Sequence, residues 1–131
     1  MKKPTLEINK KFGKSNHRWK GYEGISASDF GKIKSHAEER NIPFNITIEE
    51  AWNLFVKQDR KCALTNLPIK FRSSTMIWDG DASLDRIDNS GGYTAGNIQW
   101  VHKDINKMKM NFTEEKLIEY CKLICKHRKL L

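Results

Sequence analysis

The 131-residue sequence lacks any apolar run that approaches the roughly 20 residues needed to cross a bilayer. Two early lysines, Lys2 and Lys3, are followed by no apolar stretch, so we expect no secretory signal. Only 3 cysteines are present, an odd number that does not close into a disulfide framework. These absences predict a protein of a reducing, cytoplasmic compartment with no membrane partner.

Acidic residues are scarce relative to basic ones. The 16 Asp and Glu stand against 24 Lys and Arg, which gives a formal net charge of +8 and an isoelectric point near 9.5. Such an excess is typical of proteins that bind polyanions, because each neutralised phosphate releases condensed counterions. A small protein that binds no nucleic acid can carry the same excess of basic residues on its solvated surface. Charge therefore favours a nucleic-acid partner and leaves the second interpretation open.

The length is that of one compact domain. Residues 1–24 are basic, polar and glycine-containing, and they predict an N-terminal arm that leads into a domain over residues 25–131. Apolar spacing of three to four residues predicts a helix that is capped by Ser28 or Asp29 and ends before Pro43. Thr47 and Glu50 form a capping-box pattern, which predicts that a second helix begins there.

The second half of the chain alternates between strand and helix signals. Residues 62–71 predict a turn and a short strand with Asn66 at the bend, and residues 74–87 predict strands around an Asp79–Gly80 turn. A third strand is predicted over residues 97–101. Helices are predicted over the two later segments, 103–110 and 113–126. Helices around a small β element make the predicted fold class α+β.

Polar residues gather in residues 83–109, whose predicted order is strand, glycine-rich loop, strand and helix. Asp85 lies near the end of the first strand, and Asn106 lies in the helix. If the helix packs back across the hairpin, their oxygens converge on one hard cation such as Mg²⁺ or Mn²⁺. Asn97, at the end of the loop, is expected to hold the loop by side-chain to backbone hydrogen bonds.

This segment resembles the HNH nucleases, which have the ββα-metal fold. The resemblance is carried by the pair Asp85-Arg86, by Asn97 after the Gly91-containing loop, and by Asn106 with Lys109 downstream. It covers roughly residues 44–109. It implies a ββα-metal (HNH) core at about residues 83–109, with surrounding helices and the basic N-terminal arm. It also implies DNA hydrolysis and an origin in a phage or mobile element of a bacterial cell.

One departure from the family pattern concerns the proton acceptor. Arg86 replaces the first histidine, and an arginine cannot accept a proton near neutral pH because its pKa exceeds about 12. The guanidinium is expected to clamp the scissile phosphate instead. The candidates for the base are then Asp88, His102 or a metal-bound water that loses its proton to solvent. The alternative is a weak or inactive enzyme that still binds DNA.

A second departure concerns zinc. Many relatives brace the fold with two cysteine pairs, but here only Cys62 remains of the first, with Thr65 in its partner's place. His102 and Ile105 stand where the second pair would be. Two ligands cannot close a tetrahedral site, so we expect no structural zinc. Packing is expected to replace the metal, through Trp100, Ile105 and Met108.

Two further sets of residues have both a packing and a functional interpretation. Cys121 and Cys125 share one face of the last helix, so they either pack as small apolar residues or bind a metal together with Cys62 and His102. The second alternative is a zinc-braced interaction domain. The four tryptophans are expected in the core rather than as platforms for bases, with Trp19 of the basic arm as the first exception; the others are Trp52, Trp78 and Trp100.

The sequence thus predicts a metal-dependent DNA endonuclease that nicks or cuts by a one-metal mechanism. The residues expected to act in catalysis are Asp85, Arg86, Asn97 and Asn106, with Asp85 and Asn106 on the metal. DNA contacts are expected from the N-terminal arm, Arg86, Lys103, Lys107 and Lys109. The sequence does not predict the recognition site or the oligomeric state.

Overall fold

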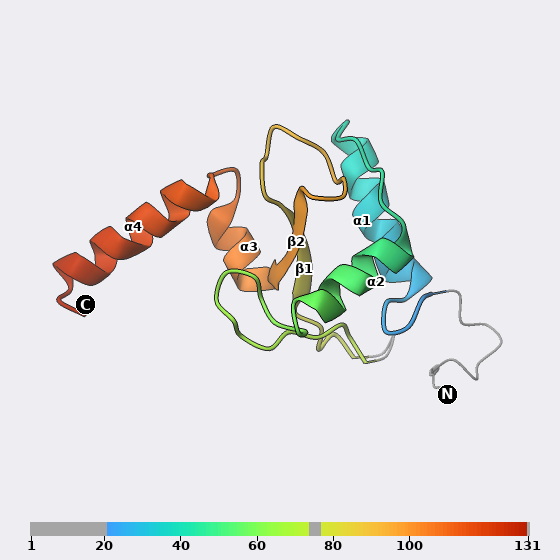
Figure 1. The fold of residues 1–131 in the computed structure, drawn as a ribbon, viewed down its shortest axis with the longest axis horizontal. Helices are drawn as coiled ribbons and strands as arrows, with labels where there is room; N and C mark the ends of the chain where they lie inside the picture. Colours follow the sequence, from blue (N-terminus) through green and yellow to red (C-terminus); the bar gives the residue numbers. More distant parts are fainter. Residues whose placement is uncertain (1–20, 74–76, 131) are drawn as a thin grey trace.

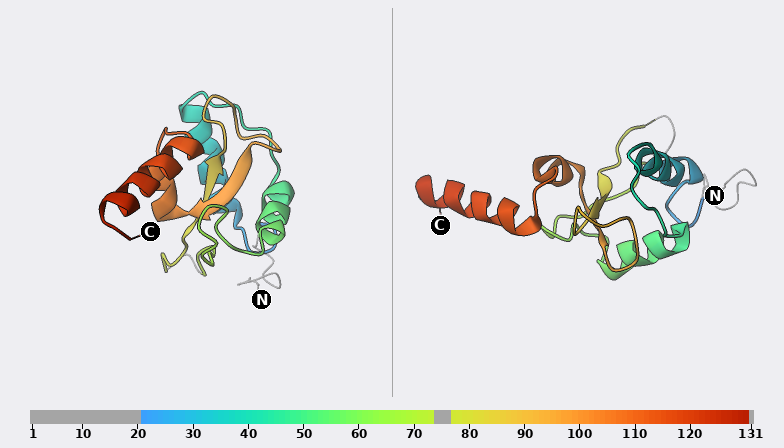
Figure 2. Two further views of the ribbon diagram at one scale, coloured as in Figure 1. Left: turned by 60° about the vertical axis from the view of Figure 1, so that its left-hand side comes forward. Right: turned by 90° about the horizontal axis from the view of Figure 1, so that it is seen from above.

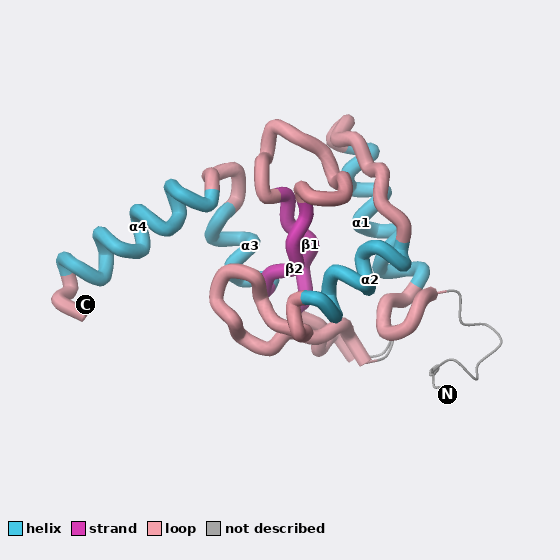
Figure 3. The backbone as a smooth tube through the Cα atoms, in the orientation of Figure 1, coloured by secondary structure: helices cyan, strands magenta, loops and turns pink. Residues whose placement is uncertain are grey.

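The computed structural model describes residues 21–73 and 77–130, and within them the fold is α+β. In these ranges the structure has four helices and a two-stranded antiparallel sheet. In Figure 1 the hairpin lies at the centre, α1 and α2 lie on one side, and α3 lies on the other with α4 projecting beyond it. Figure 3 shows that the described residues after α2, up to residue 73, form a loop.

Two predictions concern the ends and the surroundings of this fold. Most of the N-terminal arm predicted over residues 1–24 lies outside the described residues, which begin at residue 21. No helix in the two described ranges is long and apolar enough to span a membrane.

The first helix, α1 (Ala27–Glu39), is capped two residues before the nearer of the predicted caps, Ser28. Ser26 is the N-cap, because its backbone is extended and its side chain accepts a hydrogen bond from Asp29 N at 3.0 Å. The helix ends before Pro43, as predicted, and Asn41 then turns the chain with a φ of 56°.

The second helix, α2 (Ile48–Lys57), has the predicted capping box. Glu50 N donates to Thr47 Oγ1 at 3.1 Å, and Thr47 N donates to Glu50 Oε1 at 2.8 Å. Ala51 and Phe55 form its buried face. This face packs against the sheet, so α2 covers one side of the hairpin.

The hairpin consists of β1 (Ala82–Arg86) and β2 (Ile98–His102) in antiparallel register, with Asp85 opposite Gln99. The strand predicted over residues 97–101 is therefore confirmed to within one residue. The strand predicted over residues 62–71 is wrong, because only a single bridge forms there, between Lys61 and Pro68. The predicted bend at Asn66 is confirmed by its φ of 65°. Of the predicted 74–87 segment, 74–76 lie outside the described residues and only residues 82–86 form a strand.

The two faces of the hairpin differ in chemistry because side chains alternate along each strand. One face carries Leu84, Ile98 and Trp100, which join the core below α2. Trp100 is fully buried, and its indole Nε1 donates to Ala51 O at 2.8 Å. The prediction that Trp78 lies in the core is wrong, because its side chain is 70% exposed and lies under the Arg72 guanidinium.

The other face of the hairpin carries Ser83, Asp85, Gln99 and Val101, and α3 (Lys103–Lys109) packs across it. Figure 2 shows α3 against the hairpin and α4 (Glu114–His127) extending away from the body. The helices predicted over 103–110 and 113–126 are thereby confirmed to within one residue at each end. The candidate site lies between α3 and this polar face.

Candidate functional site

Asp85 is the centre of the polar face, and its carboxylate is only 4% exposed. Lys109, from the last turn of α3, donates to Asp85 Oδ1 at 3.1 Å and to Oδ2 at 3.0 Å. Gln99, opposite Asp85 on β2, donates its Nε2 to Oδ2 at 3.0 Å. The carboxylate is thus held from the helix and from the neighbouring strand, as one half of a buried ion pair.

Lys109 itself is fully buried, with 0% of its side chain exposed. Its ammonium group has three donors, and it also donates to Arg86 O at 2.8 Å. The prediction that Lys109 contacts DNA is therefore wrong. Its position on α3 faces the hairpin, where a buried carboxylate requires a counter-charge.

Asn106 lies one helical turn before Lys109 and faces the same strand. Its Nδ2 donates to Ser83 Oγ at 2.7 Å. Ser83 is two residues before Asp85, so both share one face of β1. The helix therefore brings Asn106 to the Asp85 face, and the amide nitrogen rather than the amide oxygen makes the contact with Ser83.

Asn97 makes the loop-holding hydrogen bonds that were expected of it. Its Oδ1 accepts from Asp88 N at 2.9 Å, while its Nδ2 donates to Asp88 O at 3.1 Å and to Gly92 O at 2.9 Å. A Cβ on Gly91 would lie 2.9 Å from the Asn97 amide nitrogen, so the close approach favours glycine. One side chain thus ties the two ends of the loop together.

Arg86 also stabilises the loop from within. Its Nη1 donates to Asn89 O at 2.7 Å and to Gly91 O at 2.8 Å, and its guanidinium carbon lies 5.6 Å from the centre of the Tyr93 ring. The Tyr93 backbone in turn donates to Pro43 O at 2.8 Å, which joins the loop to the segment before α2. A guanidinium that was expected to clamp phosphate is thus partly engaged by backbone carbonyls.

Asp88, one candidate base, lies in the loop, and its Oδ1 accepts from Ser90 Oγ at 2.7 Å and from Ser90 N at 2.9 Å. These two hydrogen bonds, with the nearby Arg86 charge, outweigh a small effect of burial and hold the pKa of Asp88 below its ordinary value. A lowered pKa makes the carboxylate a poorer proton acceptor. The geometry therefore favours a turn-forming role for Asp88.

His102, the other candidate base, lies at the end of β2 on the face of Leu84 and Trp100, opposite to Asp85. Its Nδ1 accepts from Asp104 N at 3.1 Å and caps α3. Its Nε2 lies 3.9 Å from Asp81 Oδ2. The strand alternation that places Asp85 under α3 turns His102 away from it, which argues against the base assignment.

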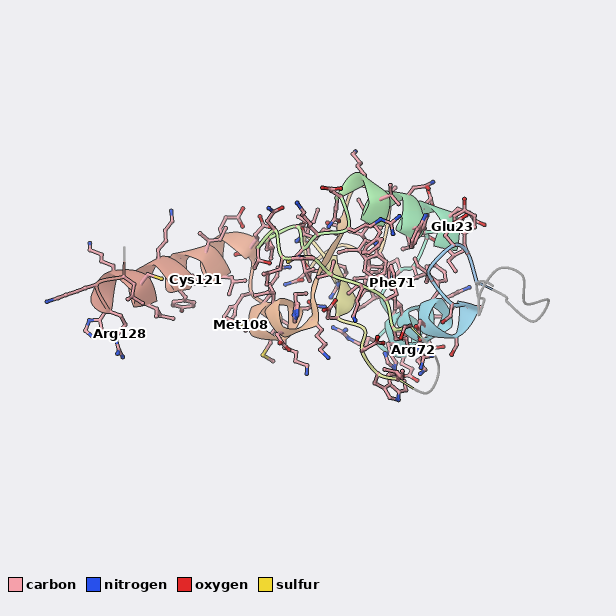
Figure 4. All side chains as sticks on the ribbon, turned by 90° about the horizontal axis from the view of Figure 1, so that it is seen from below. Glu23, Phe71, Arg72, Met108, Cys121 and Arg128 are labelled. Atoms are coloured by element: carbon pink, nitrogen blue, oxygen red, sulfur yellow. The ribbon has the colours of Figure 1, made fainter. Side chains whose placement is uncertain are left out.

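Cys62 is buried in the core, and its thiol takes part in hydrogen bonds. Burial raises the pKa of the Cys62 thiol, but hydrogen bonds from the Thr65 hydroxyl and from backbone groups, including that of His102, outweigh it and lower the pKa. In the described ranges no three His, Cys, Asp or Glu side chains converge as metal ligands. Ile105 packs against the core as expected, whereas the expectation for Met108 is wrong, because it is exposed on α3 (Figure 4).

Three residues of this site were not predicted: Ser83, Gln99 and Glu114. Gln99 joins two of the site's acids, because its Nε2 also lies 3.3 Å from Glu114 Oε1. A polar residue inside the otherwise apolar strand over 98–101 was the available signal. Lys103 and Lys107, on the outer side of α3, are exposed as a contact to phosphate requires.

Comparisons with family models, with curated proteins and with solved structures return no match to this chain.

Proposed function

We propose that this chain is a metal-dependent DNA endonuclease of the HNH type, with a ββα-metal core at about residues 83–109. One observation carries the proposal: α3 lies across the polar face of the hairpin and brings Asn106 to Ser83 and Lys109 to Asp85. The connecting loop is held by Asn97, the residue to which the family resemblance gives that position. Sequence order and spatial arrangement therefore agree over one continuous segment.

The donor chemistry fits a hard cation. Asp85, on the face of the hairpin that α3 covers, would supply a carboxylate, and Asn106 of α3 would supply an amide oxygen; such oxygen ligands suit Mg²⁺ or Mn²⁺. When bound, a divalent ion would supply charge neutralisation at the phosphate and a lower pKa for a coordinated water. Lys109 holds both oxygens of Asp85, so it competes with any cation for that carboxylate.

The remaining roles belong to the chain's own side chains. Lys103 and Lys107 are exposed on α3 and would position the DNA backbone over the site. Arg86 adds positive charge next to Asp85 in the chain while holding the loop. Asp88 and His102 are both engaged elsewhere, so in this proposal the proton of the attacking water passes to bulk solvent.

A non-catalytic DNA-binding module is the second candidate. The buried ion pair of Asp85 and Lys109 favours this candidate, because a carboxylate that is already neutralised by a lysine has less affinity for a divalent ion. The two candidates share the positive charge and the exposed lysines of α3. They differ only in whether DNA is cleaved.

Incubation with supercoiled plasmid in Mg²⁺, Mn²⁺ or EDTA separates the two. We expect relaxed or linear product with metal, none in Asn106→Ala, and full activity in Asn53→Ala, a matched change on the exposed side of α2. Circular dichroism confirms that each variant is folded. Intact plasmid under every metal, together with a shifted band on a gel, would establish the binding module instead.

A further inference from the structure

The helix α4 stands apart from the rest of the protein. Figures 1 and 2 show it projecting beyond α3, and none of its residues is buried. An isolated helix of 14 residues is marginal in water, and most helices gain their stability by packing an amphipathic face. If this helix has an apolar face, that face therefore needs a partner against which it can pack.

Such a face is present. At 100° per residue, six apolar side chains fall within an arc of roughly 160° on one side of the helix. They are Leu117, Ile118, Tyr120, Cys121, Ile124 and Cys125. Ile124 is 61% exposed and Cys121 is exposed as well, and Figure 4 labels Cys121 on the projecting helix, away from the body.

The order of residues along this face is self-complementary about Cys121. When a second α4 runs antiparallel and the two cysteines at position 121 face each other, Leu117 lies opposite Cys125 and Ile118 lies opposite Ile124. At each end of the face, seven residues from Cys121, Glu114 of one helix then lies opposite Arg128 of the other. Leu117, Ile118 and Cys121 thus meet apolar partners, Tyr120 lies opposite Lys122, and opposite charges meet at both ends.

The ends of the helix favour the same orientation. The first turn carries Glu114 and Glu115, and the last turn carries Lys126 and His127, followed by Arg128. An antiparallel pair aligns the two helix dipoles in opposite directions and places acidic ends beside basic ends, whereas a parallel pair places like charges together. A second copy of the same chain thus supplies the complementary surface.

We propose that α4 pairs with α4 of a second copy, antiparallel and centred on Cys121, to form a two-fold symmetric dimer. This inference is independent of the nuclease proposal. Two helices of this length alone bury less than about 1,200 Å² in total, at the low end of specific interfaces. We therefore expect a concentration-dependent dimer with a Kd in the micromolar range.

Sedimentation of the full chain under reducing conditions, from low to high micromolar concentration, tests the dimer. We expect Ile124→Glu to raise Kd at least about tenfold, because it places a charge in the apolar contact. The matched control is Leu123→Glu, which changes an adjacent side chain that is 54% exposed but lies outside the arc of the six apolar residues. A monomer at every concentration, or equal Kd values for the two variants, would overturn the proposal.

A short bis-maleimide crosslinker tests the orientation. A protein that retains Cys121 and carries Cys125→Ser should crosslink to a covalent dimer, whereas Cys121→Ser, which retains Cys125, should not, because Cys125 faces Leu117 of the other copy. Cys62 is buried and does not compete. Equal crosslinking of both variants would indicate a parallel pair, and crosslinking of neither would contradict the contact. Binding of monomers to anionic vesicles in place of dimerisation would also refute it.

Discussion

Replacing Lys109 with methionine removes the only ion-pair partner that the structure gives the buried Asp85 within the described residues. Lys109 is 0% exposed, Asp85 is 4% exposed, and the ammonium lies 3.0 Å and 3.1 Å from the two carboxylate oxygens. Removing one partner of a buried pair costs about 3–5 kcal/mol, because the remaining charge is left without compensation. We expect Lys109→Met to lower the free energy of unfolding by that amount.

Urea unfolding at neutral pH measures the change, and a double-mutant cycle separates its causes. Asp85→Asn alone leaves Lys109 uncompensated and should also be costly. The double variant removes both charges, so its cost should fall at least about 2 kcal/mol below the sum of the single variants. The control is Lys107→Met, on the exposed face of the same helix, which should stay within about 0.5 kcal/mol of the wild type.

The same variants test competition for Asp85. Mn²⁺ should stabilise Lys109→Met more than the wild type, because the ammonium no longer holds the carboxylate. A ligand at one hundred times its Kd adds about 2.7 kcal/mol to the free energy of unfolding. The Asp85→Asn/Lys109→Met protein should not respond. Additive single variants would refute the ion-pair reasoning, and equal Mn²⁺ stabilisation of Lys109→Met and wild type would refute the competition.

Three further predictions address the loop, the pH dependence and the DNA contacts. Asn97→Ala removes three hydrogen bonds and should destabilise the protein by about 2 kcal/mol in urea unfolding, whereas a change under about 0.5 kcal/mol would show that the loop closes without it. Burial alone would raise the pKa of Asp79, but hydrogen bonds from Ser73 and Lys70 outweigh it and hold the pKa below its ordinary value. Because the folded-state pKa is the lower one, Asp79 contributes stability above about pH 4 that disappears as pH falls through the folded-state value. Asp79→Asn should therefore reduce the fall of the unfolding temperature as the pH becomes acidic. An unchanged fall would count against this reasoning. Replacing Lys103 and Lys107 together with alanine should reduce the slope of log K against log salt by about 0.9 for each phosphate that the protein no longer neutralises. Fluorescence anisotropy with duplex DNA measures that slope, and an unaltered slope would exclude α3 from the interface.

The features that the sequence predicted correctly have local causes. The capping box of Thr47 and Glu50 involves residues three apart, and the hairpin with its following helix is marked by apolar segments around a glycine-rich loop. The hydrogen bonds of Asn97 also stay within one loop. Such features depend little on the rest of the chain, so pattern and propensity suffice to find them.

The incorrect predictions for Lys109, Met108 and Trp78 concern which side of an element faces the core. A lysine at the end of a short helix is ordinarily solvated, and only the position of Asp85 beneath α3 explains why Lys109 is buried. For His102 the sequence leaves open both a surface position and a place beside the site, and strand alternation places it on the face opposite to Asp85. Trp78 is predicted in the core, yet it lies exposed against Lys32 and Arg72. These outcomes depend on long-range packing.

The most direct measurement of nuclease activity is the rate at which the wild-type protein relaxes supercoiled plasmid in Mn²⁺ and in EDTA. We expect relaxation in Mn²⁺, none in EDTA, and at least about a hundredfold slower relaxation by folded Asn106→Ala. Equal rates for the wild type and Asn106→Ala would place the chemistry elsewhere. Plasmid that stays supercoiled in Mn²⁺ at protein concentrations that saturate DNA binding would contradict the proposed endonuclease outright.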